Sequence, residues 1–218
     1  YFILVKLSKR GKREIKNTLI KTISLAILTL LSFNTFVYAS IGEPVDIAEE
    51  YSILSSTTYE EGMNVDAKSA LLVEPVSGTV LYEKNSEEKF APASVTKIMT
   101  MLLAIEAVDN GNITLNDKIV CSENAKNMGG STMLLDTGEV RTVEEILKGI
   151  AIASGNDAAV AMAEFLGGSV DNFVSMMNKR AKELGMVNTN FKNCNGLPEE
   201  GHYTTAKDIS IMSLELLK

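Results

Sequence analysis

A succession of capped, amphipathic helical segments constrains the fold of this chain more than any other feature. Residues 94–109 carry a helical stripe of apolar side chains and end at Asn110-Gly111, a pair that commonly ends helices. Thr142 and Glu145 form a capping box, which predicts that a second helix begins there. Further helices are predicted over residues 157–166, 169–184 and from 205 to the last residue, Lys218. These segments predict a body built mainly of packed helices.

Two short β-rich runs precede the helices. The stretch AKSALLVEPVSGTVLYEKN, residues 67–85, places them on either side of a turn that contains proline and glycine, which is typical of a β-hairpin. Residues 112–141 are expected to form mostly loop with short strands. A hairpin followed by helices predicts an α+β domain.

The first 39 residues differ in charge from the rest of the chain. They contain seven lysines and arginines against one acid, Glu14, although the whole chain has a net charge of −7. A basic start, the apolar run ISLAILTLLSFNTFV and the small residues Val37 and Ala39 are typical of an export signal. We therefore expect a signal peptide over residues 1–39 that is cleaved after Ala39, with an uncleaved signal anchor as the alternative. The acidic residues 40–62 show no clear period and are predicted to be a linker.

Cysteine and histidine are scarce, which limits the chemistry of the chain. Cys121 and Cys194 are the two cysteines, and His202 is the single histidine. One pair of cysteines is not a disulfide framework, so both are expected to be free and buried, although a pairing stays open. A single histidine excludes a multi-histidine zinc site and makes any Ser-His-Asp triad depend on His202. We expect no metal, no cofactor and no nucleic-acid partner.

The spacing S-x-x-K occurs twice. Ser86 and Lys89 lie in a run of charges without an apolar face, where a solvated loop is expected. Ser94 and Lys97 open an apolar helix, and their spacing puts both side chains on one face.

The start of a helix favours a developing alkoxide, while burial and the helix dipole lower the pKa of a lysine there. A neutral lysine can then accept the serine proton. The pattern predicts Ser94 as a nucleophile and Lys97 as its base. The alternative is an N-cap serine followed by a partly buried lysine.

The sequence Ser154-Gly155-Asn156 lies between two predicted amphipathic helices. Neither the apolar periodicity nor the helix length requires a break at this point. A serine hydroxyl there can relay a proton to a leaving amine, and an asparagine amide can hold a substrate carbonyl. An ordinary interhelix turn is the alternative, because all three are turn residues. A rival match, Ser122 and Asn124, follows a strand-like run and is better explained as a turn at a strand end.

S-x-x-K followed by S-x-N resembles two of the three motifs of penicillin-recognising serine enzymes. The stretches GGSTMLLDTGE, IASGNDAAVAMAE and NGLPEEGHYTTAKD extend this likeness, so that residues 64–218 resemble serine-type D-alanyl-D-alanine carboxypeptidases. The resemblance implies a β-lactamase/transpeptidase-like α+β fold, in which a helical region packs on an antiparallel sheet. Residues 63–218 would form the catalytic domain, with only the first hairpin of the sheet present.

The resemblance also implies a reaction. Ser94 would attack the carbonyl between the two terminal D-alanines of a peptidoglycan stem peptide, and Lys97 would take its proton. Ser154 would help pass a proton to the departing D-alanine, while Asn156 would position the acyl chain. Water would then hydrolyse the acyl-enzyme, and β-lactams would be trapped on the serine. The protein would act outside the cytoplasm, at the cell wall or the outer face of the membrane.

One feature departs from the family pattern, and several alternatives stay open. The third motif, Lys-Thr/Ser-Gly, does not occur in the 218 residues, so we expect a truncated gene product that cannot turn over substrate. Peripheral membrane association through a missing C-terminal region stays open. A class A-like β-lactamase, with Glu199 or Glu200 activating the water, and a non-catalytic β-lactam sensor remain alternatives. His202 lies in the same loop and is expected to brace it.

Overall fold

A computed structural model describes residues 3–4 and 65–218 of the chain. The linker expected at residues 40–62 lies outside the described residues. So does the expected signal peptide, apart from Ile3–Leu4. The prediction of cleavage after Ala39 therefore stays a prediction.

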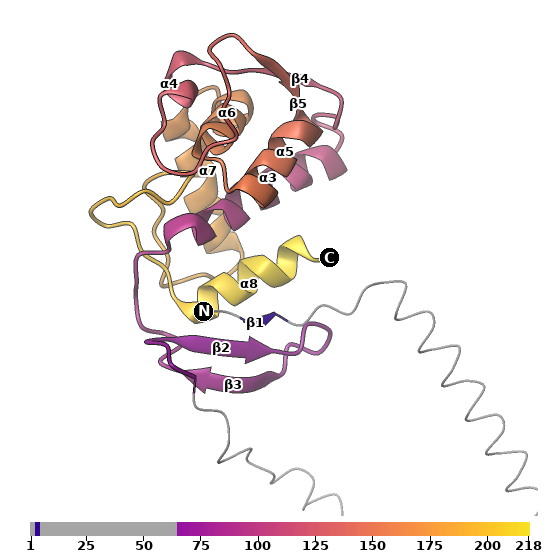
Figure 1. Cartoon of the computed structure of the whole chain (residues 1–218). Coiled ribbons are helices and arrows are strands. Elements are labelled where there is room, and N and C mark those ends of the chain that lie inside the picture. The colour runs from indigo at the N-terminus through magenta and orange to yellow at the C-terminus, as the bar shows by residue number, and fades with distance from the viewer. Residues whose placement is uncertain (1–2, 5–64) are drawn as a thin grey trace, which may run out of the picture.

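The hairpin predicted over residues 67–85 is confirmed. Strand β2 (Ala70–Val73) pairs antiparallel with β3 (Val80–Lys84), with Leu72 opposite Tyr82. The other edge of β2 pairs in parallel with β1 (Ile3–Leu4). The resulting sheet therefore has β2 at its centre, as Figure 1 shows.

The helices follow the predicted order. In chain order they are α3 (Lys97–Asp109), α4 (Glu123–Lys126), α5 (Val143–Ala153), α6 (Asn156–Gly167), α7 (Val170–Glu183) and α8 (Ala206–Leu216). Figure 1 shows α8 lying between the sheet and the other helices. This contact is apolar, because Leu71 and Val73 of β2 are buried against Ala206 and Leu214 of α8. The sheet and the helical body therefore form one layered α+β fold, as the sequence predicts.

Helix α6 lies at the centre of the helical body. Its first eight residues, Asn156–Ala163, are all buried, and α3, α4, α5 and α7 pack around it. Alanine-rich sequence suits this position, because small side chains let neighbouring helices approach closely. Phe173 and Met177 of α7 pack into the same core, whereas Met176 is 39% exposed. The predicted core role is therefore confirmed for Phe173 and Met177 but wrong for Met176.

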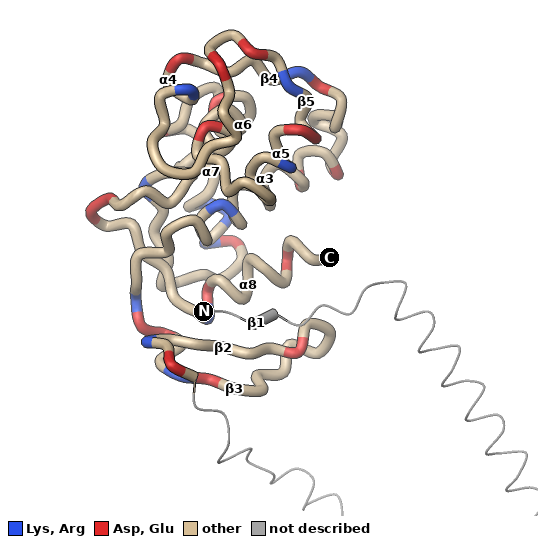
Figure 2. The backbone as a smooth tube through the Cα atoms, viewed as in Figure 1, with Lys and Arg blue, Asp and Glu red and all other residues tan. Residues whose placement is uncertain are grey.

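Hydroxyl side chains cap several of these helices. Ser122, Thr142, Ser169 and Thr205 each accept a hydrogen bond from a backbone N–H in the first helical turn. Acidic residues in the same turns, among the red positions of Figure 2, complement the helix dipoles. The capping box predicted at Thr142 and Glu145 is confirmed.

A second, two-stranded sheet joins β4 (Lys118–Val120) to β5 (Val140–Thr142) within the region expected to hold short strands. Ser122 follows the end of β4, as expected for the Ser122 and Asn124 match, but it caps the one-turn helix α4 where a turn was predicted. Within the described residues, no helix is long and apolar enough to cross a membrane.

Three further local expectations were wrong. The helix expected to begin at Ser94 begins at Lys97, and a 3-10 turn, η1 (Ala93–Thr96), precedes it. The last helix ends at Leu216 instead of running to the end of the chain. Ser86 is not solvated but only 2% exposed: its hydroxyl donates to the Glu83 carboxylate, and its carbonyl oxygen accepts from the Lys207 N–H. Packing of the α8 start against the hairpin buries it.

A hollow of about 660 Å³ lies between α3, α8 and the segment that leads into β2. Val95, Ile98 and Ile209 contribute to its apolar lining. Ser94 and Lys97 do not line it, so this hollow is separate from the predicted site.

Candidate active site

The structure brings Ser94 and Lys97 together. Ser94 lies in η1 and is exposed, whereas Lys97, the first residue of α3, is only 2% exposed. Lys97 Nζ lies 3.2 Å from Ser94 Oγ, which is within hydrogen-bonding distance. An accessible hydroxyl and a buried amine are thus in direct contact.

The surroundings of Lys97 favour its neutral form. Lys97 Nζ donates a hydrogen bond to the backbone carbonyl oxygen of Asn195 at 2.8 Å. Burial lowers the pKa of Lys97, because an ammonium loses its hydration there, and the nearby Cys194 opposes this shift only in part. The amine can therefore accept a proton from Ser94 more readily than an exposed lysine could.

The loop 193–197 closes around the start of α3. The hydroxyl of Thr100 donates to the carbonyl oxygen of Cys194 at 2.7 Å. Gly196, at a φ of +92°, lies so close to η1 that an added Cβ would overlap the carbonyl oxygen of Ala93. Ala93 itself has a φ of +48°. The loop therefore fixes both the Lys97 amine and the turn that carries Ser94.

Sequence reasoning did not predict roles for Asn195 and Gly196. The pair Asn-Gly is a turn signal, but its backbone contacts with Lys97 and Ala93 span about a hundred residues along the chain. The sequence offers no local sign of such contacts.

Ser154 and Asn156 occupy the break between α5 and α6. Ser154 caps the end of α5 in a left-handed conformation, with a φ of 53°. Asn156 is 5% exposed, and its side-chain amide donates to the carbonyl oxygen of Gly129 at 2.7 Å. Among the described residues, hydrogen bonds join Ser94 to Lys97 but do not extend from that pair to Ser154 or Asn156.

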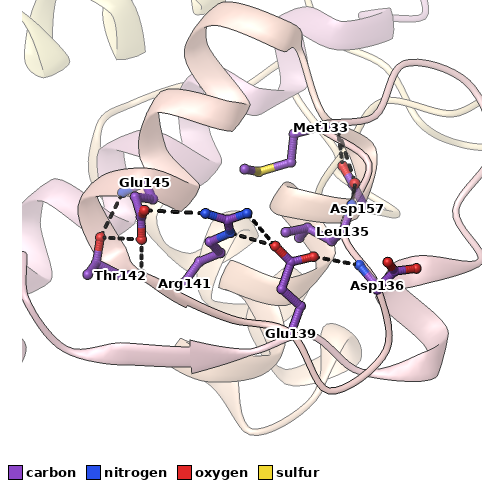
Figure 3. A network of polar contacts seen from close by, with 8 residues as sticks. All are labelled: Met133, Leu135, Asp136, Glu139, Arg141, Thr142, Glu145 and Asp157. Carbon is purple, nitrogen blue, oxygen red and sulfur yellow. Dashed lines mark hydrogen bonds and ion pairs between the residues drawn. The ribbon is translucent and has the colours of Figure 1, made fainter.

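Asp157 anchors the loop that faces Asn156. Its buried carboxylate accepts hydrogen bonds from the backbone N–H groups of Met133 and Leu135 at 3.0 Å each, and from Ala158 at 2.8 Å. Figure 3 shows the Asp157 carboxylate directed at the backbone of this loop. Between its two contacts, Leu134 adopts a φ of 65° and is 84% exposed. The carboxylate thus holds the loop in a strained conformation.

A second polar network holds the other end of the same loop. Glu139 accepts from Arg141 Nε at 2.6 Å and from the Asp136 N–H at 2.8 Å. Arg141 also reaches the Glu145 carboxylate, which belongs to the capping box of α5 (Figure 3). The loop between Gly129 and β5 is therefore fixed at both ends against α5 and α6.

His202 braces the site. It is 5% exposed, its Nε2 lies 2.8 Å from Thr96 Oγ1, and its Nδ1 accepts from the Lys192 N–H at 2.9 Å. These contacts agree with the bracing role expected for it.

The remaining chemical candidates are the two cysteines and the glutamates of the loop before α8. Cys121 and Cys194 are free and buried, and burial raises the pKa of Cys194 to about 12. Glu199 and Glu200 are exposed, and the Glu199 carboxylate accepts from the Asn193 side chain at 3.1 Å. In the part of the chain that the structure describes, no group of three or more His, Cys, Asp or Glu residues is placed to hold a metal ion.

Comparison with solved structures identifies the class of fold. The structure matches the D-alanyl-D-alanine carboxypeptidase DacD from Francisella tularensis with a TM-score of 0.71 at 37% identity, over 72% of this chain and 38% of that one. It matches penicillin binding protein 5 from Haemophilus influenzae with a TM-score of 0.70 at 33% identity, over 72% and 46% of the two chains. The fold is that of the penicillin-binding proteins.

The family follows from the sequence comparisons. The model of the Peptidase_S11 family, described as D-alanyl-D-alanine carboxypeptidase, matches residues 55–218. The D-alanyl-D-alanine carboxypeptidase DacF of Bacillus subtilis is 63% identical over 153 residues, 70% of this chain and 39% of the relative. DacC of Escherichia coli is 37% identical over 72% of this chain and 41% of its own length. The chain belongs to the D-alanyl-D-alanine carboxypeptidase family and spans about two fifths of the length of these relatives.

Proposed function

We propose that the protein is a serine-type D-alanyl-D-alanine carboxypeptidase. Together with a Lys-Thr/Ser-Gly motif, which these 218 residues lack, it removes the terminal D-alanine from peptidoglycan stem pentapeptides through an acyl-enzyme on Ser94, and it binds penicillin covalently at the same residue. The observation that carries the proposal is the buried Lys97 amine, 3.2 Å from the exposed Ser94 hydroxyl. The names of the relatives support the choice of substrate.

The first chemical step uses these two side chains. Neutral Lys97 accepts the proton of Ser94 while the serine oxygen attacks the carbonyl between the two D-alanines. The amine of the departing D-alanine then needs a proton, which Ser154 helps to deliver in this proposal. Asn156 positions the acyl portion of the peptide, and water completes the hydrolysis.

Mapping the acylated residue tests the site. The protein, expressed from its complete reading frame, is incubated with a fluorescent penicillin, and the labelled peptide is identified by mass spectrometry. We expect the label on Ser94. A label on Ser86, Ser122 or Ser154 would contradict the assignment, and a Ser94→Ala variant provides the matched control.

A second measurement separates the proposed activity from its alternatives. A carboxypeptidase releases D-alanine from a pentapeptide and keeps its penicilloyl group for a long time. A β-lactamase that used Glu199 or Glu200 would lose the group rapidly. A sensor domain would acylate without releasing D-alanine. The names of the relatives favour the carboxypeptidase.

We further propose that the protein is exported and works at the cell wall or at the outer face of the membrane. The basic start and apolar run of residues 1–39 support this proposal, as does the cell-wall substrate. N-terminal sequencing of the exported protein tests it, with Ser40 expected as the first residue. An intact N-terminus would favour a signal anchor.

A further inference from the structure

His202 connects the two segments that hold Lys97. Its Nε2 contacts the hydroxyl of Thr96, the residue immediately before Lys97. Its Nδ1 accepts from the backbone of Lys192, which shares a loop with Asn195, the carbonyl partner of Lys97. These contacts close a ring that runs from Lys97 to Thr96, His202, the 192–195 segment and back to Lys97. We refer to it as the His202 ring.

The contacts of His202 determine its protonation. Because Nδ1 accepts a hydrogen bond from the Lys192 N–H, the neutral imidazole carries its proton on Nε2 and donates it to Thr96 Oγ1. Burial lowers the pKa of His202, and the negative charge of Glu199 opposes this shift in part. The ring of Phe191 packs beside the imidazole, with centroids 6.0 Å apart. At neutral pH the imidazole is therefore neutral, buried and held on two sides.

We propose that His202 is a positioning residue for Lys97 and acts on it through Thr96 and the 192–195 segment. This inference rests on the proposed function of Lys97 as a base. A neutral amine has a single lone pair, which must point at Ser94 Oγ to accept its proton. The Asn195 carbonyl binds an N–H of the same nitrogen at 2.8 Å and so sets its orientation. The place of that carbonyl relative to α3 depends on the His202 ring.

Thr96 offers the sharpest test, because its hydroxyl is buried and can be removed without a change of shape. Thr96→Val deletes the contact to His202, whereas Thr96→Ser keeps it. We expect Thr96→Val to slow acylation by a fluorescent penicillin about 10-fold or more, since a small displacement of a catalytic group is costly. Its non-covalent affinity for penicillin should stay within about threefold of the parent. Thr96→Ser should recover most of the acylation rate.

His202→Asn provides an independent variant. Its side-chain oxygen can still accept from the Lys192 N–H, but it is too short to reach Thr96. We expect a loss of acylation rate similar to that of Thr96→Val. The double variant should be no slower than the slower single variant, because both changes break the same contact.

Thr205→Val serves as the matched control. Thr205 lies near His202 in the chain and caps α8 by accepting from the Asp208 N–H at 3.0 Å, outside the His202 ring. This variant should melt at a lower temperature but acylate at the parental rate. The inference would be overturned if folded Thr96→Val acylated at a rate within threefold of the parent. It would also be overturned if Thr96→Val and Thr96→Ser lost the same amount of acylation rate. A parent protein that is not acylated at all would contradict the proposed function instead.

Discussion

Lys97 lies in an environment that sets its protonation state. The side chain is 2% exposed, and its nitrogen contacts a serine hydroxyl and a backbone carbonyl. A carbonyl is a weaker partner for an ammonium than a carboxylate, so it offsets little of the cost of burying a charge. Desolvation consequently dominates and lowers the pKa of Lys97.

This shift predicts how acylation depends on pH. In the proposed mechanism the reactive form of Lys97 is the neutral amine, so the acylation rate should rise with pH through the pKa of Lys97 and then level off. Because burial lowers that pKa, the midpoint should fall below about 10.4, the ordinary value for lysine. Stopped-flow acylation with a chromogenic cephalosporin between pH 5 and 11 measures the profile. A midpoint at or above the ordinary value would contradict this assignment.

A substitution at Lys97 tests its proposed role as the base. Arginine keeps the positive charge at position 97 but cannot be deprotonated in a protein. Lys97→Arg should therefore acylate about 10²- to 10⁴-fold more slowly, which is the usual loss when a general base is removed. Lys148→Arg, at an exposed position of α5, is the control and should react like the parent. A rate for Lys97→Arg within threefold of the parent would make Lys97 an electrostatic or structural residue.

At the scale of elements, the sequence predicts helix boundaries that are set by interactions between residues close together in the chain. The start of α5 was predictable because Thr142 and Glu145 form their capping box within one helical turn. The start of α3 was not, because η1 is shaped by contacts with a loop about a hundred residues further along the chain. The burial of Ser86 could not be predicted either, because the backbone of Lys207 in α8, far along the chain, contacts it. Sequence motifs therefore identify candidate site residues more readily than the loops that position them.

The loop 193–197 gives a prediction about this long-range contact. Gly196→Ala would place a methyl group against the Ala93 carbonyl and within 2.9 Å of the Ser94 nitrogen, in a left-handed conformation. We expect it to lower the free energy of unfolding by about 3 kcal/mol or more, and to reduce acylation strongly. Gly111→Ala is the control: it has a φ of +72° but open space around its Cβ, so it should cost only about 1–2 kcal/mol. Urea denaturation measures both, and equal losses would contradict the close contact.

The loop that faces Asn156 depends on one buried carboxylate. Asp157→Asn keeps the shape of the side chain but directs an N–H₂ group at backbone N–H donors of the loop 133–135. An unsatisfied buried donor costs about 1–3 kcal/mol, so we expect a destabilisation of that size and faster hydrogen exchange in this loop. Asp136→Asn, with its carboxylate 79% exposed, should change the stability by less than about 1 kcal/mol. If hydrogen exchange in the loop 133–135 is the same in Asp157→Asn as in the parent, contacts other than the Asp157 carboxylate hold this loop.

For the whole molecule, the path of the chain explains which candidate site residues a sequence can show and which contacts it cannot. Ser94, Lys97, Ser154 and Asn156 belong to short motifs near helix boundaries, so one sequence shows them as candidates even where, as at α3, it misplaces the boundary itself. The Asn195 carbonyl and the His202 contacts arise only when the chain between α7 and α8 folds back over the start of α3. No local pattern determines that return path. A resemblance to a family of known fold could predict this path of the chain, but the spacing of residues could not.

Arg180 joins three helices of the molecule and carries the last prediction. From α7 it donates to Glu106 of α3 at 2.6 Å and to Glu215 of α8 at 3.1 Å. All three side chains are about one quarter exposed, so solvent screens this cluster less than a surface pair.

Arg180→Met keeps most of the apolar stem but leaves two carboxylates facing each other. We expect a loss of about 1–3 kcal/mol in the free energy of unfolding, which is less than the loss from breaking a fully buried pair. Lys179→Met is the matched control on the same helix, because Lys179 is 79% exposed and lies 3.9 Å from Glu183. It should cost less than about 1 kcal/mol. If urea denaturation gives the two variants the same stability, the contacts of Arg180 do not hold α3, α7 and α8 together, and apolar packing between these helices does so alone.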